Sequence, residues 1–301
     1  MVWSTLRRPG VVAWRSWTLG RASRRRFFAS SSSPPPKPKF STMGVGGTGL
    51  VAGALGSLAG MGGGFVAIPM MTHFGVSQHA AHGTSLAGVV ATGCAGAAAY
   101  WFSGQVDPVA ALTVASTGSL TAMAGARAAA ALEAKVLKRC LGCFMLAVAP
   151  VVPFKEQIAH YVKKATTTTD NNNGEQKRPA PPFGALLGIG CFAGFLAGLF
   201  GVGGGAIVVP MLAMATDMDY KCALGTSLLA MVPTGVAGVI AHARLGNVQA
   251  RIAGPLVGGT CAGAFLGGYL GGNLIPEEPM KLGFGVLMTA LGARTLLTTF
   301  L

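Results

Sequence analysis

The sequence predicts an all-α, polytopic membrane protein with about eight transmembrane helices in two internal repeats of four helices each. Its composition is apolar, since 51% of the 301 residues are hydrophobic, only 11% are charged and 46 are glycine. Glycine averages about 7% in proteins, and its excess is typical of transmembrane helices, whose neighbours satisfy the backbone that glycine disturbs. A soluble chain of this composition would expose large apolar patches. The lipid bilayer is therefore the expected environment.

An internal repeat supports the division into two halves. Eleven of the 22 residues in segment 49–70 recur identically in segment 190–211, which lies 141 positions later. A second block, GTSL at 83–86, returns at 225–228 after one inserted residue. Duplication around glycine-rich interruptions is a sequence mark of transporters whose site lies between the halves.

Eight apolar segments meet or approach the roughly 20 residues that a spanning helix needs. The first and the fifth exceed 30 residues and contain a triple glycine, so each is predicted to be a broken helix, with unwound backbone at 60–64 and 201–205. Runs of glycine weaken a helix by about 1 kcal/mol per residue relative to alanine. The segments are approximately 44–74, 78–103, 108–132, 136–154, 183–214, 220–243, 251–274 and 281–300.

The predicted organisation is a disordered targeting peptide, a membrane repeat, a polar linker and a second membrane repeat. Four spans per repeat is an even number, which predicts halves of the same orientation related by an axis along the membrane normal. A broken segment that enters and leaves on one side would instead make the halves inverted. The four parts are 1–43, 44–154, 155–182 and 183–301.

The charge is concentrated in the N-terminal arm. The net charge is +14, but residues 1–43 hold nine of the 23 Lys and Arg and no Asp or Glu, so no nucleic-acid partner is expected. An arm rich in Arg and Ser without acids is typical of transit peptides. The run from Arg26 to Ser30 resembles a mitochondrial processing site, with cleavage after Phe28. The mitochondrial inner membrane is the favoured location, and a chloroplast membrane is the alternative.

The two glycine breaks are the predicted site for a small anionic substrate. Unwound backbone within a bilayer is tolerated only where protein buries it or where it lines a watery cavity. Half-helices that begin near Phe65 and Ala206 would direct N–H groups and a partial positive charge at an anion. The alternative is that the glycines only permit close helix packing. The Thr and Ser hydroxyls of the GTSL blocks either contact the anion or satisfy freed backbone. The candidate substrate-binding residues are Gly60, Gly62, Gly63, Gly64, Thr84, Ser85, Gly201, Gly203, Gly204, Gly205, Thr226 and Ser227.

Enzyme signatures receive little support, because the run Gly60–Gly64 does not give GxGxxG, no GxxxxGK[ST] occurs and no helix offers HExxH. His79 and His82 have metal-like spacing, but no Asp, Glu or Cys stands nearby to complete a site. Neither catalysis, a metal nor a cofactor is expected. The six cysteines are expected to be small buried side chains.

The duplicated motifs GMGGGFVAIPMM and GVGGGAIVVPML, each followed by GTSL, resemble the sulfite exporter TauE/SafE family of membrane permeases over residues 46–300. The resemblance implies secondary transport of sulfite, sulfoacetate or related sulfur-containing anions. Two alternatives stay open: a non-transporting membrane scaffold or assembly protein, and a passive anion channel. The anion, the coupling ion, the direction and a homo-oligomeric state are not determined by the sequence.

Overall fold

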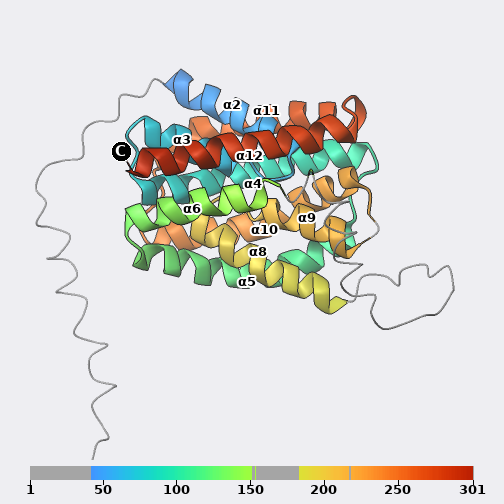
Figure 1. Cartoon of the computed structure of the whole chain (residues 1–301), viewed down its shortest axis with the longest axis horizontal. Helices are drawn as coiled ribbons and strands as arrows, with labels where there is room; N and C mark the ends of the chain where they lie inside the picture. The colour runs from blue at the N-terminus through green and yellow to red at the C-terminus, as the bar shows by residue number, and fades with distance from the viewer. Residues whose placement is uncertain (1–41, 151–152, 154–182, 217, 301) are drawn as a thin grey trace, which may run out of the picture. The chain divides into compact units, whose positions relative to one another are not determined.

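The protein, seen in a computed structural model, is helical throughout the parts that the structure describes, which are residues 42–150, 153, 183–216 and 218–300. These parts contain no strand and belong to one compact unit, Lys39–Leu301. Residues 1–41 of the predicted targeting segment and the whole predicted linker lie outside the described residues. The described helices (Figure 1) are α2 (Thr42–Leu58), α3 (Gly64–His73), α4 (Gln78–Phe102), α5 (Pro108–Ala131), α6 (Ala134–Val148), α8 (Phe183–Phe200), α9 (Gly205–Ala215), α10 (Tyr220–Arg244), α11 (Ala250–Asn273) and α12 (Glu277–Phe300).

Five of the described helices are long and apolar enough to cross a membrane: α4, α5, α8, α10 and α12. The protein is therefore a multi-pass integral membrane protein, with five candidate spans in place of the eight predicted. The α6 helix has only 15 residues, and α2 and α9 are apolar but short. The α11 helix has 24 residues, but its many glycines and Arg251 reduce its hydropathy.

Both overlong segments are divided at their glycine motifs, as the sequence predicts. The α2 helix ends at Leu58 and α3 begins at Gly64, while α8 ends at Phe200 and α9 begins at Gly205. We call residues 59–63 the first break and residues 201–204 the second break. Left-handed backbone with φ between 67° and 90°, which glycine adopts without steric cost, occurs at Gly60, Gly62, Gly63, Gly201, Gly203 and Gly204.

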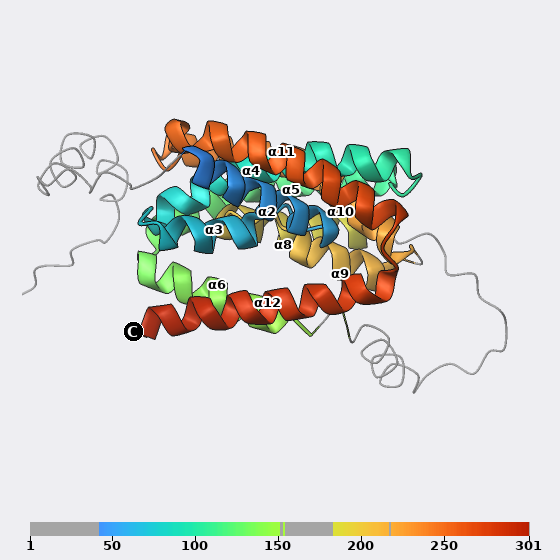
Figure 2. The same ribbon diagram turned by 90° about the horizontal axis from the view of Figure 1, so that it is seen from above.

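The chain reverses direction at each break. Gly63 lies against the backbone of Ala52 in the middle of α2, and Gly204 lies against the backbone of Ala193 in the middle of α8. Each second half-helix therefore runs back beside its own first half-helix. Figure 2 shows α3 and α9 returning toward opposite ends of the bundle, each to the start of the next long helix. Each broken segment is thus a re-entrant hairpin.

Corresponding helices of the two repeats run antiparallel. On the α4–α10 contact, Gly96 packs against Leu228 and Gly238 packs against Leu86, so residue numbers rise along one helix as they fall along the other. The prediction of parallel halves is therefore wrong, and the two copies are inverted. The reason is the re-entrant hairpin: the three further helices of each copy, an odd number, place the start of the second copy at the opposite end of the bundle.

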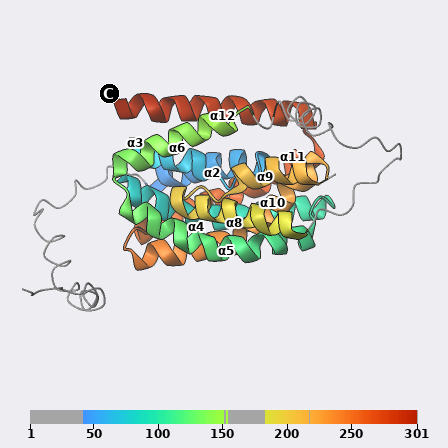
Figure 3. The same cartoon turned by 60° about the horizontal axis from the view of Figure 1, so that its bottom comes forward.

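Each hairpin packs against a helix of the other copy. Gly53 of α2 lies against Thr260 of α11, and Gly194 of α8 lies against Gly118 of α5. In both pairs the residue numbers rise together, so the paired helices are parallel. Small residues let helix backbones approach closely, and this packing replaces the hydrophobic driving force that lipid does not provide. The copies are interlocked around α4 and α10, while α6 and α12 form a separate outer layer (Figure 3).

Candidate functional site

The two breaks touch each other in the interior of the bundle. A methyl group placed on Gly64, the first residue of α3, would lie 2.7 Å from the Cα of Val202 and 2.8 Å from the carbonyl oxygen of Gly201. Gly205, the first residue of α9, lies in the same way against the backbone of Gly60 and Met61. The positive ends of two half-helices therefore meet at one point, and all twelve candidate site residues are buried there or directly beside it.

Both half-helices begin with N–H groups that have no acceptor among the described residues. At the first break these are the N–H groups of residues 62–65, and at the second break those of residues 203–206. A buried N–H group without a partner costs about 1–3 kcal/mol, so native proteins pair such groups with protein, water or a ligand. No Lys, Arg, Asp or Glu is buried in the described core. The electrostatic character of the contact is set by these backbone dipoles.

The serines of the GTSL blocks hold the carbonyl oxygens of the breaks. Ser85 Oγ donates to the carbonyl of Gly201 at 2.7 Å, and Ser227 Oγ donates to the carbonyl of Gly60 at 3.0 Å. Each serine therefore stabilises the break of the opposite copy. The hydroxyls satisfy carbonyl lone pairs, which would otherwise repel an anion near the N–H groups.

The threonines of the same blocks hold the loops of the opposite copy. Thr84 Oγ1 accepts the N–H of Gln249 at 3.1 Å, and Thr226 Oγ1 accepts the N–H of Asp107 at 2.9 Å. Gln249 and Asp107 are the N-cap residues of α11 and α5. In this conformation the four hydroxyls form hydrogen bonds with the backbone. The sequence left open whether they contact an anion or satisfy freed backbone, and here they satisfy backbone.

Two apolar side chains that the sequence did not single out fill the space beside the breaks. Val89 of α4 and Met231 of α10 lie against both Gly62 and Gly203, and both side chains are buried. They are related by the 142-residue offset of the GTSL blocks. Each lies four positions after the serine of its GTSL block, on the same face of the helix, and this spacing could have identified both residues from the sequence. We call this pair the central plug.

An aromatic stack closes the break contact on the side of the outer layer. The ring of Phe144 on α6 lies between those of Phe65 and Phe200, with centroid distances of 6.3 Å and 5.4 Å. Phe65 follows the first break and Phe200 precedes the second. The repeat places Ala206 and Ala59 at the corresponding positions, so the stack exists on one side only. This asymmetry is readable from the aligned repeats.

The cysteine interpretation is wrong for five of the six residues. Cys94, Cys140, Cys143, Cys191 and Cys261 are exposed on the protein surface. They lie on the outward faces of their helices. Among the described residues, no three or more His, Cys, Asp or Glu gather in a way that could hold a metal ion.

The arrangement defines a class of membrane protein: interlocked inverted copies whose re-entrant half-helices meet at a buried point. In a comparison with known protein families, the family model for sulfite exporter TauE/SafE matches residues 45–295. The chain belongs to this family.

Similar curated proteins carry transporter names. The chain is 29% identical over 230 residues to the probable membrane transporter protein YunE of Bacillus subtilis (strain 168), which covers 72% of this chain and 84% of the relative. It is 30% identical over 235 residues to a probable membrane transporter protein of Xylella fastidiosa (strain 9a5c), covering 75% and 83%. It is 28% identical over 201 residues to the probable membrane transporter protein MJ0441 of Methanocaldococcus jannaschii, covering 64% and 69%. No solved structure matches. The family and these names support a membrane transporter.

Proposed function

We propose that the protein is a secondary transporter that moves sulfite or sulfur-containing organic anions across an organellar membrane. The observation that carries the proposal is the meeting of two half-helix N-termini with unpartnered N–H groups. Such groups bind anions through short hydrogen bonds and the helix dipole, without a buried cation. Membership of the sulfite exporter family supports the choice of anion.

The transported anion binds between the starts of α3 and α9 once the central plug moves aside. The backbone N–H groups of the breaks hold its oxygens. Ser85 and Ser227 keep the break carbonyls turned away from it, and Thr84 and Thr226 fix the loops that support α4 and α10. Inverted copies provide alternating access, because each copy adopts in turn the conformation that the other has just left.

Uptake into proteoliposomes tests the proposal. The full-length protein is reconstituted, and uptake of radiolabelled sulfite is measured with and without sulfite preloaded inside. A transporter gives saturable uptake that preloaded substrate accelerates, whereas a passive channel gives uptake that neither saturates nor accelerates. Uptake unchanged in a variant with both Gly63→Leu and Gly204→Leu contradicts a site at the breaks.

A non-transporting scaffold is the second candidate, and the closeness of the break contact favours it. Almost every glycine at the breaks lies so close to neighbouring atoms that a methyl group would collide. The one cavity described there, beside Gly203, Gly204 and Thr234, has a volume of only about 10 Å³, enough for about one water molecule. Absence of uptake for sulfite, thiosulfate, sulfonates and carboxylates, in protein that melts cooperatively, is the result expected of a scaffold.

The organellar part of the proposal depends on residues 1–43, which are basic and free of acids. A reporter fused after residue 43 is expected to enter mitochondria, and the processed product is expected to begin at Ala29. Import into plastids would favour the chloroplast alternative. A reporter that stays in the cytosol would remove the organellar assignment and leave the transport proposal intact.

A further inference from the structure

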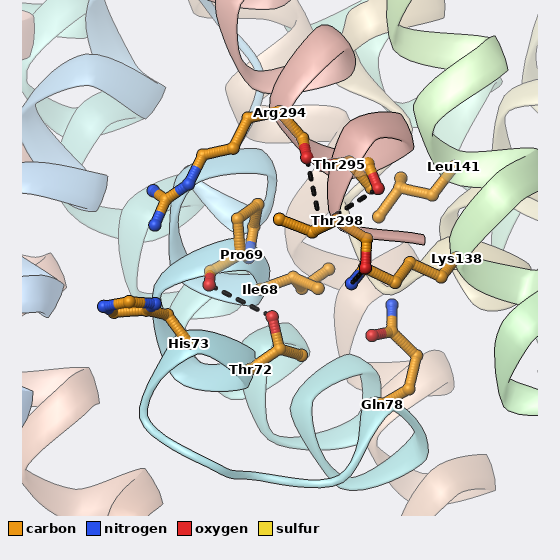
Figure 4. Close-up of a pocket in the computed structure, with 10 residues that line it drawn as sticks. All are labelled: Ile68, Pro69, Thr72, His73, Gln78, Lys138, Leu141, Arg294, Thr295 and Thr298. Carbon is orange, nitrogen blue, oxygen red and sulfur yellow. Dashed lines mark hydrogen bonds between the residues drawn. The ribbon is translucent and has the colours of Figure 1, made fainter. Parts of the chain in front are cut away.

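A basic cavity lies at one end of the bundle, outside the break contact. It has a volume of about 270 Å³ and is enclosed by α3, α4, α6 and α12. Its lining includes His73, Lys138 and Arg294, and no carboxylate among the described residues lines it. Figure 4 shows Arg294 and His73 on one side of the cavity and Lys138 with Gln78 on the other. Like charges that share one hollow repel each other, so the lining favours a negatively charged occupant.

Several donors in this cavity are not used by the protein. Lys138 Nζ donates to the carbonyl oxygen of Thr298 at 3.1 Å, which leaves two of the three ammonium hydrogens. The Arg294 guanidinium forms no ion pair or hydrogen bond with any described residue. Gln78 Nε2 bonds to His82 Nε2 at 2.8 Å and retains a second hydrogen. Guanidinium and ammonium groups both bind the oxygens of oxyanions through charge-assisted hydrogen bonds.

Part of the cavity lining is apolar. Ile68 and Leu141, both buried, form this part. One helical turn deeper, on the same two helices, lie Phe65 and Phe144 of the aromatic stack. Ligand cavities have volumes of about 300–1,000 Å³, so a cavity at the lower limit suits a small inorganic ion or a single headgroup phosphate.

A hydrogen-bonded chain links this cavity to the second break. Gln78 donates to His82 Nε2, and His82 Nδ1 donates to the carbonyl oxygen of Phe200, the residue before the break. The Nδ1 atom carries the hydrogen because a carbonyl oxygen can only accept. An occupant that contacts Gln78 is therefore two side chains away from the second break.

The opposite end of the bundle has no such lining. The cavity there, between the end of α2 and the start of α12, has a volume of about 170 Å³. It is lined by apolar residues such as Leu58, Met280 and Phe284 and by no charged side chain. The basic lining is therefore found in the cavity at one end of the bundle and is not reproduced in the cavity at the other end by the internal repeat.

We propose that the cavity enclosed by α3, α4, α6 and α12 is an oxyanion-binding site in which Lys138 and Arg294 hold the ligand. Two sources share this chemistry: a small free oxyanion, such as sulfite or phosphate, and the phosphate of an acidic lipid headgroup. The site is separate from the break contact, so it binds its ligand whether or not the protein transports.

Titration of purified full-length protein in neutral detergent tests the free-ion source. Sodium sulfite and inorganic phosphate are added at constant ionic strength, and binding is measured by calorimetry. Loss of one charge-assisted hydrogen bond corresponds to about tenfold weaker binding, which is expected for both Lys138→Gln and Arg294→Gln. Lys135→Gln is the matched control, because it removes the same charge from an exposed position of α6 outside the cavity. Lys138→Arg keeps the charge and is expected to bind as the wild type does.

The lipid source is tested in nanodiscs of phosphatidylcholine with and without phosphatidylglycerol. Native mass spectrometry is expected to show phosphatidylglycerol retained by the wild type and by Lys135→Gln, and lost from Arg294→Gln. Free-ion binding or lipid retention that depends on Lys138 and Arg294 supports the site.

Wild-type protein that binds neither probe overturns the proposal, as do variants that bind like the wild type. Anion binding unaffected by both variants, together with sulfite uptake, would leave the break site standing and remove this one. Binding that is lost in the variants, with no uptake by the wild type, would support this site and contradict the proposed transport.

Discussion

Gly64→Ala tests the contact between the two breaks most directly. The backbone of Gly64 is not left-handed, so alanine introduces no strain in φ, and the whole effect comes from the added methyl group. That group would lie 2.7 Å from the Cα of Val202 and 2.8 Å from the oxygen of Gly201. Carbon atoms in contact are normally about 3.5–4.0 Å apart, so one break has to move by about 1 Å.

The expected cost of this substitution is about 2 kcal/mol of stability, within the range of 1–3 kcal/mol for an overfilled core. Both neighbours are backbone atoms, which cannot rotate away as a side chain can. For a protein of this size the melting temperature is expected to fall by about 3 °C. Sulfite uptake into proteoliposomes is expected to fall as well, because the N–H groups that meet at the contact are displaced.

Gly254→Ala is the matched control. Gly254 is a helical glycine with no neighbouring atom within 4 Å of the added methyl group. Alanine favours a helix over glycine by about 1 kcal/mol, so this variant is expected to melt at the wild-type temperature or slightly above it. If both variants melt within a degree of each other and transport equally, the two breaks do not touch as described.

Substitutions at three further positions address the residues around the contact. Ser227→Ala leaves the carbonyl of Gly60 without its donor and is expected to cost about 1–2 kcal/mol, measured by thermal unfolding in detergent. Thr84→Val removes the acceptor of the Gln249 N–H at a similar cost, and Thr84→Ser is expected to restore stability because it keeps the oxygen. Phe144→Ala deletes the half-buried middle ring of the aromatic stack, is expected to cost about 2 kcal/mol, and is expected to raise anion leak through proteoliposomes.

Each of these variants has a control that makes the same chemical change elsewhere. Ser119 and Thr289 donate only to carbonyls of their own helices and neither is buried, so Ser119→Ala and Thr289→Val are expected to change stability by less than about 0.5 kcal/mol. Phe102 is 81% exposed, and its replacement by alanine is expected to leave both stability and leak unchanged. Equal effects of a variant and its control would mean that the contact in question contributes nothing specific.

The breaks could be predicted from the sequence because they depend on local chemistry. A triple glycine within an apolar segment too long for one span weakens the helix wherever the segment is placed in the fold. The direction of the chain after the break could not be predicted in this way. It is decided by contacts such as that of Gly63 with Ala52, which are made only once the hairpin has closed. The count of crossings, and with it the inverted relation of the copies, depends on that contact.

The roles of the hydroxyls and charges were harder to read for a related reason. Thr84 and Ser85 suit ligand binding and backbone repair equally well, and only the position of their acceptors and donors in the other copy distinguishes the two. Lys138 and Arg294 lie far apart in the sequence and line the same cavity because α6 and α12 pack antiparallel. The sequence did give one signal, since a charge within an apolar segment is costly unless it reaches water or a ligand.

The positions at which the two copies differ make the two ends of the molecule unequal. The symmetric framework, with Ser85 and Ser227 each holding the opposite break, allows the same conformational change at either end. His82 and Phe65 have Leu224 and Ala206 at the corresponding positions, so the hydrogen bond from His82 to Phe200 and the stacking of Phe65 on Phe144 have no counterpart in the other copy. Under the proposed alternating access, unequal ends change the relative populations of the two access states and the rates of exchange between them. They cannot set the net direction of a transport cycle, because at equilibrium any bias in one half of the cycle is cancelled in the other. In a transporter of this design, direction therefore has to come from the gradients of the anion and of any ion that moves with it.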